Sequence, residues 1–292
     1  MLVRIHCLAL TFVVGLLALT PGTSRAAESY DNCTGFIDSL PAVVSTQGTW
    51  CLRKDLSTAI GTGNAITVAA NNITIDCNDF KLGGLAAGAD TLAHGIVAID
   101  RQNVTVRHCN ARGFWAGVYL QGFSGGGHLV EDSRFNNNVN TGIFVEGDGS
   151  VVRRNQVTDT GGEDPYLGGT LVGIYGIGAV EVMDNTISGV FASDGSDGWV
   201  AGITLVGSVG GIVQGNRVRG VVSDGLGQSI GIEIFDSFRV TLRSNNAIGS
   251  GSGMGMICNG EFIRARDNMV NGFLTPMQDC GDAGGNDLVG IP

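Results

Sequence analysis

A glycine followed by a short apolar segment recurs seven times along this chain, and no other feature constrains the fold as strongly. Successive recurrences are 22 to 31 residues apart, at Gly95-Ile96, Gly117-Val118, Gly142-Ile143, Gly173-Ile174, Gly202-Ile203, Gly231-Ile232 and Gly255-Met256. A repeat of this length is typical of solenoids, in which each unit stacks on the one before it.

Each repeat continues with two further apolar positions that frame a small polar one. The first apolar position holds Val106, Val130, Val152, Val182, Val213, Leu242 and Ala265. Three residues later come Cys109, Ser133, Asn155, Asn185, Asn216, Asn245 and Asn268. The second apolar position holds Ala111, Phe135, Val157, Ile187, Val218, Ala247 and Val270. Because asparagine tolerates left-handed backbone and bonds to its neighbours in turns, the polar series predicts an asparagine ladder at one corner.

The spacing inside a repeat indicates strands rather than helices. Ile143 and Val145 alternate with Phe144 and Glu146, which is the two-residue period of a strand. The 48 glycines of the 292 residues disfavour helix, so we expect at most one helical cap near residues 53–60. The pattern predicts an all-β, single-domain parallel β-helix of about eight to nine coils, each rising about 4.8 Å.

The two ends of the chain differ from the repeats. Residues 1–27 combine Arg4, an apolar run from Leu8 to Leu19 and small residues at the end, which is the pattern of a secretory signal peptide. The alternative, a membrane anchor, requires about 20 apolar residues. We therefore expect a signal peptide over 1–27, an N-terminal cap over 28–63, the β-helix over 64–275, and a C-terminal cap or tail over 276–292.

Charge and export limit the partners of this protein. The net charge is −10 and becomes −12 when Arg4 and Arg25 leave with the signal peptide. An acidic protein binds nucleic acid poorly, because the phosphate backbone is also negatively charged. We expect a secreted or periplasmic monomer with no nucleic-acid partner and no membrane span after signal removal.

Six cysteines remain after the signal peptide, and an even number in an exported protein predicts disulfides. Six cysteines allow fifteen connectivities. The repeat places Cys77 and Cys109 in neighbouring slots of adjacent coils, which selects that pair. Proximity along the chain selects Cys33–Cys51 and Cys258–Cys280, which would fasten the two ends of the solenoid.

Two segments near the N-terminus carry a family resemblance. Residues 48–56, Gly-Thr-Trp-Cys-Leu-Arg-Lys-Asp-Leu, and residues 72–78, Asn-Ile-Thr-Ile-Asp-Cys-Asn, resemble the entry coil of secreted right-handed parallel β-helix repeat proteins of the pectate-lyase-like superfamily. The resemblance covers about residues 45–275 and implies a right-handed β-helix. Because this fold carries lyases, hydrolases, epimerases, adhesins and non-catalytic proteins, it implies no single activity. The paired Asp, Gly-His-Gly and Arg-Ile-Lys signatures of polygalacturonases are missing, with Ala93-His94-Gly95 as the nearest match, and the Tyr-Gly-x-Asp-Pro-His of mannuronan epimerases is missing as well.

One column of charges is explained by stacking alone. The position after the first apolar residue holds Asp76, Arg107, Glu131 and Arg153 in successive coils. Alternating charges that lie over one another in a parallel stack attract. We interpret these residues as a surface ladder and exclude them from the candidate site.

The candidate site lies where coil length varies. Insertions near 159–172, 192–200 and 221–229 would project on one side of the solenoid, and projecting loops commonly carry function. The strands that follow show Tyr119, Phe144, Tyr175, Thr204 and Glu233 on their outward side, with Gln121 and Glu146 one pleat further along. The substrate-binding candidates are Tyr119, Phe144, Tyr175, Tyr166 and Trp199. The alternative interpretation of the aromatic residues is a ladder that only stabilises the strands.

Carboxylates supply the catalytic candidates, because glycoside hydrolysis requires two carboxyls about 5–10 Å apart. The candidates are Glu146, Glu233, Asp197, Asp164 and, as a histidine acid or base, His94. Glu146 and Glu233 are three coils apart, about 14 Å by the stacking rise, so either would need a loop acid as its partner. No cofactor is certain. Calcium could be held by Asp194 and Asp197, although their segment lacks the spacing of a calcium loop.

We therefore expect an exported, carbohydrate-active β-helix that binds a polysaccharide or cell-surface glycan along the aromatic strand face. Cleavage by a lyase or hydrolase reaction is a further expectation. The rival hypothesis is a non-catalytic surface, structural or adhesive β-helix whose aromatic and charged residues only join the coils.

Overall fold

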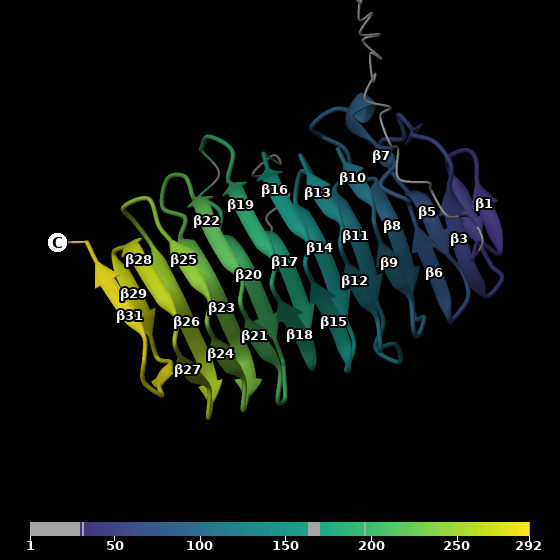
Figure 1. Ribbon diagram of the computed structural model, residues 1–292. Coiled ribbons are helices and arrows are strands. Elements are labelled where there is room, and N and C mark those ends of the chain that lie inside the picture. Colours follow the sequence, from purple (N-terminus) through teal and green to yellow (C-terminus); the bar gives the residue numbers. More distant parts are fainter. Residues whose placement is uncertain (1–29, 31, 163–169, 196, 292) are drawn as a thin grey trace, which may run out of the picture.

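The structure is a computed structural model that describes residues 30, 32–162, 170–195 and 197–291. In these residues the strands form three parallel sheets of eleven, ten and ten strands, which make the sides of an elongated β-helix (Figure 1). We call the eleven-stranded sheet sheet A, the sheet that contains β2 (Ala42–Val44) sheet B, and the sheet that contains β4 (Leu56–Ser57) sheet C. In each coil the chain passes from sheet B to sheet A, then to sheet C and back to sheet B. The all-β parallel solenoid predicted from the repeat is confirmed.

The strands are grouped by sheet as follows. Sheet A consists of β1 (Gly35–Ile37), β3 (Gly48–Leu52), β6 (Ile73–Asp76), β9 (Thr105–Arg107), β12 (Leu129–Glu131), β15 (Ser150–Arg153), β18 (Val180–Met183), β21 (Ile212–Gln214), β24 (Thr241–Arg243), β27 (Arg264–Arg266) and β30 (Gly281–Asp282). Sheet B consists of β2 (Ala42–Val44), β5 (Asn64–Val68), β8 (His94–Ile99), β11 (Ala116–Gln121), β14 (Thr141–Glu146), β17 (Leu171–Ile177), β20 (Val200–Val206), β23 (Ser229–Phe238), β26 (Met254–Glu261) and β29 (Thr275–Gln278). Sheet C consists of β4 (Leu56–Ser57), β7 (Lys81–Gly83), β10 (Asn110–Arg112), β13 (Arg134–Asn136), β16 (Gln156–Gly161), β19 (Thr186–Phe191), β22 (Arg217–Val222), β25 (Asn246–Ile248), β28 (Met269–Phe273) and β31 (Asp287–Gly290).

The solenoid extends into both segments predicted as caps. Strands β1 to β4 lie within residues 28–63, and β30 and β31 lie within 276–292, yet all six pair with the same three sheets. The sheet B strands from β5 to β26 lie between residues 64 and 273, whereas β2 precedes this range and β29 follows it. One additional coil is therefore present at each end.

The prediction of a helical cap near residues 53–60 is wrong. Leu56 is 6% exposed and pairs with Leu82 of β7, so this segment begins sheet C as strand β4. Pairing with β7 satisfies its backbone groups and buries the leucine, which outweighs the local preference for helix. The one helical element among the described residues is a 3-10 turn, η1 (Leu85–Ala87).

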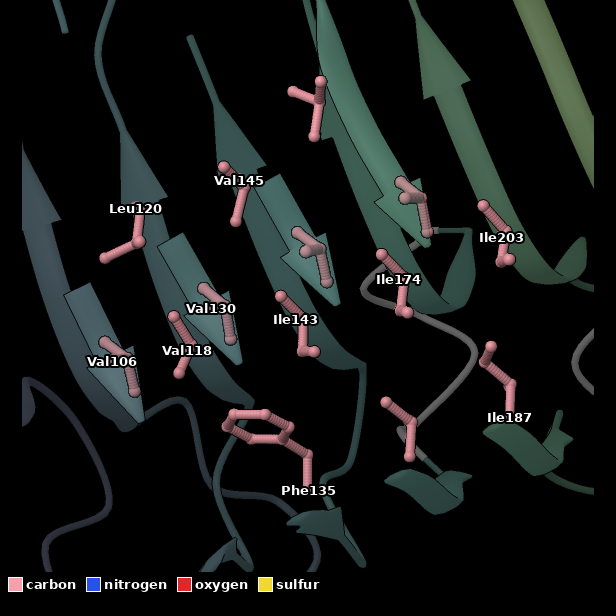
Figure 2. Packing of buried hydrophobic residues seen from close by; sticks show 14 of the residues in the cluster. Val106, Val118, Leu120, Val130, Phe135, Ile143, Val145, Ile174, Ile187 and Ile203 are labelled. Atoms are coloured by element: carbon pink, nitrogen blue, oxygen red, sulfur yellow. The ribbon is translucent and has the colours of Figure 1, made fainter. Parts of the chain in front are cut away.

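The apolar positions of the repeat form the interior. Val106, Val130, Val118 and Ile143 are fully buried, and Figure 2 shows their side chains directed into one interior together with Phe135 from sheet C. In sheet B, Val118 pairs with Ile143 and Ile143 pairs with Ile174, so like side chains stack from coil to coil. Burying each such side chain contributes about 1.5–3 kcal/mol.

The predicted asparagine ladder is present at the corner between sheets A and C. Each asparagine donates from Nδ2 to a carbonyl of the preceding coil and accepts on Oδ1 from the backbone amide of that coil's ladder residue, as Asn185 does with Val152 and Asn155. The ladder continues through Asn216, Asn245 and Asn268, all buried, and ends at Asn286.

The three predicted disulfides are confirmed. Their Cα–Cα distances are 5.8 Å for Cys33–Cys51, 4.7 Å for Cys77–Cys109 and 4.9 Å for Cys258–Cys280. Disulfides are typical of proteins from oxidising, extracytoplasmic compartments. The predicted signal peptide lies outside the described residues.

Candidate glycan-binding face

The outward residues of sheet B form one continuous column. Register pairs join Tyr119 to Phe144, Phe144 to Tyr175, Tyr175 to Thr204 and Thr204 to Glu233. These residues alternate with buried residues, so the two-residue period places all five on the outer face of the sheet. We call them the outer column.

The aromatic rings of the outer column stack on one another. The ring centroids of Tyr119 and Phe144 are 4.4 Å apart with an interplanar angle of 17°, and those of Phe144 and Tyr175 are 5.4 Å apart at 6°. Both faces of the Phe144 ring are therefore covered by its neighbours. A sugar ring therefore cannot pack on a face of Phe144, and the column presents its ring edges and the two tyrosine hydroxyls.

His94 and Trp115 extend this aromatic group toward the N-terminal end. The His94 ring lies 4.9 Å from that of Tyr119 and 5.2 Å from that of Trp115. Burial lowers the pKa of His94 below its ordinary 6.5, although a hydrogen bond to the Gly63 carbonyl opposes this. At neutral pH, His94 is thus an uncharged member of an aromatic cluster. Trp115 is not among the residues predicted from the sequence; its signal is the aromatic pair Phe114-Trp115, of which Phe114 is fully buried and Trp115 only partly.

Glu146 ends β14 beside a hollow of about 200 Å³. The residue is 8% exposed, and among the described residues its carboxylate has no hydrogen bond or ion pair. Its negative charge raises the pKa of Tyr119 in addition to the larger effect of burial. Glu146 is thus a largely buried residue whose carboxylate has no protein partner among the described residues.

Glu233 lies at the other end of the outer column. Its Oε2 accepts a hydrogen bond of 3.1 Å from the Thr204 hydroxyl. Burial raises the pKa of Glu233 above its ordinary 4.5, because a half-buried carboxylate is poorly hydrated, and the Thr204 bond opposes the rise. Three coil steps separate it from Glu146, about 14 Å, which is outside the spacing of a glycosidase pair.

The raised pKa of Glu233 predicts a pH effect on stability. The folded protein binds this proton more tightly than the unfolded chain, so stability is lost as pH rises from 4.5 through the folded-state pKa. Glu233→Gln removes that loss. We expect its thermal midpoint to exceed that of the wild type at neutral pH and the difference to shrink below pH 4.5. The exposed Glu261→Gln serves as the matched control; an equal gain there would contradict the prediction.

The loop candidates are divided between described and undescribed residues. Asp164 and Tyr166 lie outside the described residues. Trp199 is 45% exposed, and its carbonyl accepts from the amide of Leu171 at the start of β17. Asp197 Oδ1 accepts from the backbone amide of Leu226 at 2.6 Å, so this carboxylate joins two neighbouring loops.

Asp194, the other calcium candidate, lies in the same loop and is exposed. The described residues contain no group of three or more His, Cys, Asp or Glu side chains arranged to hold a metal ion. The pairing of Asp194 with Asp197 as a calcium site therefore stays a prediction.

The four alternating charges of the sheet A column form two ion pairs, as the column predicts. Arg107 Nε lies 2.7 Å from an oxygen of Asp76, and Arg153 lies 2.8 Å from Glu131. Arg154 adds two further contacts, to Glu131 and Asp132, and lowers the pKa of Asp132. The carboxylates of Asp76, Glu131 and Asp132 therefore form ion pairs between adjacent coils.

Sheet B differs from the other two sheets in its charges. None of its ten described strands contains lysine or arginine, and the acids Glu146 and Glu233 lie on it without a cationic partner. Sheets A and C carry arginine in many of their strands, for example Arg153, Arg217 and Arg219. Among the described residues, no helix is long and apolar enough to cross a membrane.

Comparison with known proteins agrees with this architecture. The family model described as "Right handed beta helix region" matches residues 54–179 and 94–273, which together cover most of the chain. The chain belongs to this right-handed β-helix family. No curated protein sequence matches this β-helix significantly.

Solved structures similar to this β-helix are distant. An A-module of mannuronan C-5 epimerase AlgE6 from Azotobacter vinelandii has 11% identity and a TM-score of 0.46, over 90% of this chain and 92% of that one. The Dettilon tailspike protein has 14% identity and a TM-score of 0.42, over 85% of this chain. A GH87 α-1,3-glucanase catalytic domain has 14% identity and a TM-score of 0.37, over 87% of this chain. This β-helix spans 60% of the tailspike chain and 63% of the glucanase chain.

Proposed function

We propose that this protein is an exported carbohydrate-binding β-helix that holds an extended glycan along the outer column of sheet B. The observation that carries the proposal is that neither Glu146 nor Glu233 has a cationic partner among the described residues. Burying a carboxylate without a cation is costly, and the same chain pairs Asp76 and Glu131 of sheet A with arginine. Acids kept in this condition on an outer face are candidates for ligand contacts.

The side chains along this face suit a ligand rich in hydroxyl groups. Carboxylates accept hydrogen bonds from sugar hydroxyls, and the hydroxyls of Tyr119 and Tyr175 both donate and accept. The contacts repeat from coil to coil at about 4.8 Å, so they form a line suited to an extended chain. Because the described strands of sheet B contain no lysine or arginine, the face favours neutral or cationic glycans over uronates.

Binding without cleavage is the form of activity that the geometry favours. Glu146 and Glu233 are too far apart to act as a hydrolase pair, and Asp197 bonds to Leu226. Lyase action on a uronate requires a cation that neutralises the sugar acid, and the strands of sheet B supply none.

A specific observation favours a second candidate, the structural or adhesive protein. Tyr119, Phe144 and Tyr175 stack face to face, which is the arrangement of a ladder that stabilises adjacent strands. On this interpretation the three residues contribute to stability and not to ligand binding.

A polysaccharide panel distinguishes the two functions. Calorimetric binding to neutral, acidic and amino glycans is measured together with reducing ends and unsaturated products. We expect binding to at least one glycan without either product. Tyr175→Phe keeps the ring stack and removes one hydroxyl, so we expect about fivefold weaker binding at an unchanged thermal midpoint. Absence of binding across the panel would leave the structural protein, and product formation would make the protein an enzyme.

A further inference from the structure

A small hollow lies where the chain turns from sheet B to sheet A, beside the outer column. It has a volume of about 200 Å³ and is lined by Phe123, Glu146, Asp148, Ile177 and neighbouring glycines. The strands β14 and β17 supply Glu146 and Ile177, and the turn between β11 and β12 supplies Phe123. Of these residues, Glu146 alone is a candidate predicted from the sequence.

The charged groups that line the hollow are both acids. Glu146 is more than nine-tenths buried and has no hydrogen-bond or ion-pair partner among the described residues. Asp148 accepts a 2.8 Å hydrogen bond from the Ala179 amide on Oδ1, and no described group bonds its Oδ2. Arg101 lies on the adjacent turn, where its carbonyl oxygen lies beside Gly125, and its Nε is buried without a hydrogen-bond partner among the described residues.

Phe123 gives the hollow an aromatic wall. Its side chain is 91% exposed, in a turn that runs through Gly122 and the glycines 125–127. An exposed phenylalanine buries almost no apolar surface, so packing does not account for it. A cation that lies between an aromatic ring and a carboxylate forms a cation–π interaction with the face of the ring. It also forms a charge-assisted hydrogen bond with the carboxylate.

We propose that this hollow binds the protonated amino group of an amino sugar within the glycan held on sheet B. The inference rests on the proposed function and adds the class of sugar. The ammonium group donates hydrogen bonds to the Glu146 and Asp148 carboxylates, and the sugar carbon atoms next to it pack against Phe123. The volume admits one such group rather than a long segment of chain.

A bare divalent cation fits the hollow less well. Calcium takes six to eight oxygen ligands, and no group of three or more acidic, histidine or cysteine side chains is arranged around an ion in the described residues. An ammonium group needs only two or three acceptors, which Glu146 and Asp148 supply.

The test compares glucosamine oligomers with N-acetylglucosamine oligomers of the same length by calorimetry, in mildly acidic, low-salt buffer containing a chelator. Acetylation removes the charge and leaves the rest of the sugar in place. We expect the glucosamine oligomer to bind at least about tenfold more tightly, with an affinity that falls as salt rises. Glu146→Gln and Phe123→Ala should each remove most of that preference. Glu181→Gln, an acid on sheet A outside any ion pair, is the matched control and should change nothing.

Each outcome has a definite meaning. Equal binding of both oligomers, or a preference that survives both variants, overturns the amino-sugar site while the proposed glycan binding stands. Binding that requires added calcium also overturns it. Absence of binding to both oligomers and to the rest of the panel overturns the site and the proposed function together. Thermal midpoints of both variants near that of the wild type show that a lost preference is not a folding defect.

Discussion

Asn216→Ala is expected to lower the free energy of unfolding by about 4 kcal/mol. The buried Asn216 side chain takes part in four hydrogen bonds: Nδ2 donates to Val182 and Asn245, and Oδ1 accepts from the backbone and side-chain amides of Asn185. Alanine removes all four and leaves buried groups unsatisfied, at about 1 kcal/mol each. Urea unfolding measures the loss.

The control for this prediction is Gln156→Ala. Gln156 is an exposed polar residue on the outer face of β16, and its removal should change stability by no more than about 0.5 kcal/mol. Equal effects at the two positions would show that the asparagine ladder does not stabilise the solenoid.

Gly142→Ala is expected to destabilise the protein by about 3 kcal/mol. A Cβ at this position would lie 2.5 Å from Val157 Cγ1 and 2.6 Å from the Gly173 carbonyl oxygen. That carbonyl belongs to the next coil, so the backbone cannot withdraw without disturbing the pairing of β14 with β17. The repeated glycine is thus required by space rather than by an unusual φ.

Gly61 supplies the matched control. A Cβ there would meet nothing within 4 Å, and Gly61→Ala should be neutral or slightly stabilising, because alanine restricts the unfolded chain. Thermal unfolding of both variants decides the point. A Gly142→Ala protein as stable as the wild type would mean that the coils separate easily at this corner.

The repeat predicts the parts of the fold that depend on register. Once the glycines are aligned, a two-residue period places Val118 inside and Tyr119 outside, and it places Cys77 beside Cys109. Each of these follows from backbone geometry, which the sequence pattern specifies directly. The same geometry places Tyr119, Phe144 and Tyr175 in one column.

The features that could not be predicted depend on side-chain conformation and on contacts between irregular segments. Register does not determine ring orientation, so the sequence left open whether the stacked rings of Tyr119 and Tyr175 cover both faces of Phe144, as they do. Asp197 bonds to the Leu226 amide in a neighbouring loop, a contact between irregular segments that has no periodic signal. Phe123 was overlooked because its glycine-rich turn lies outside the repeated positions.

Mapping of the bound glycan tests the proposed function most directly. Backbone amide hydrogen exchange is compared with and without a saturating concentration of the tightest-binding glycan of the panel. Protection is predicted in β11, β14, β17, β20 and β23 and in the turn at Phe123, with no change in the strands of sheet C. Protection confined to sheet A or sheet C, or an exchange pattern unchanged by a glycan that binds, would contradict the assignment of the outer column as the binding face.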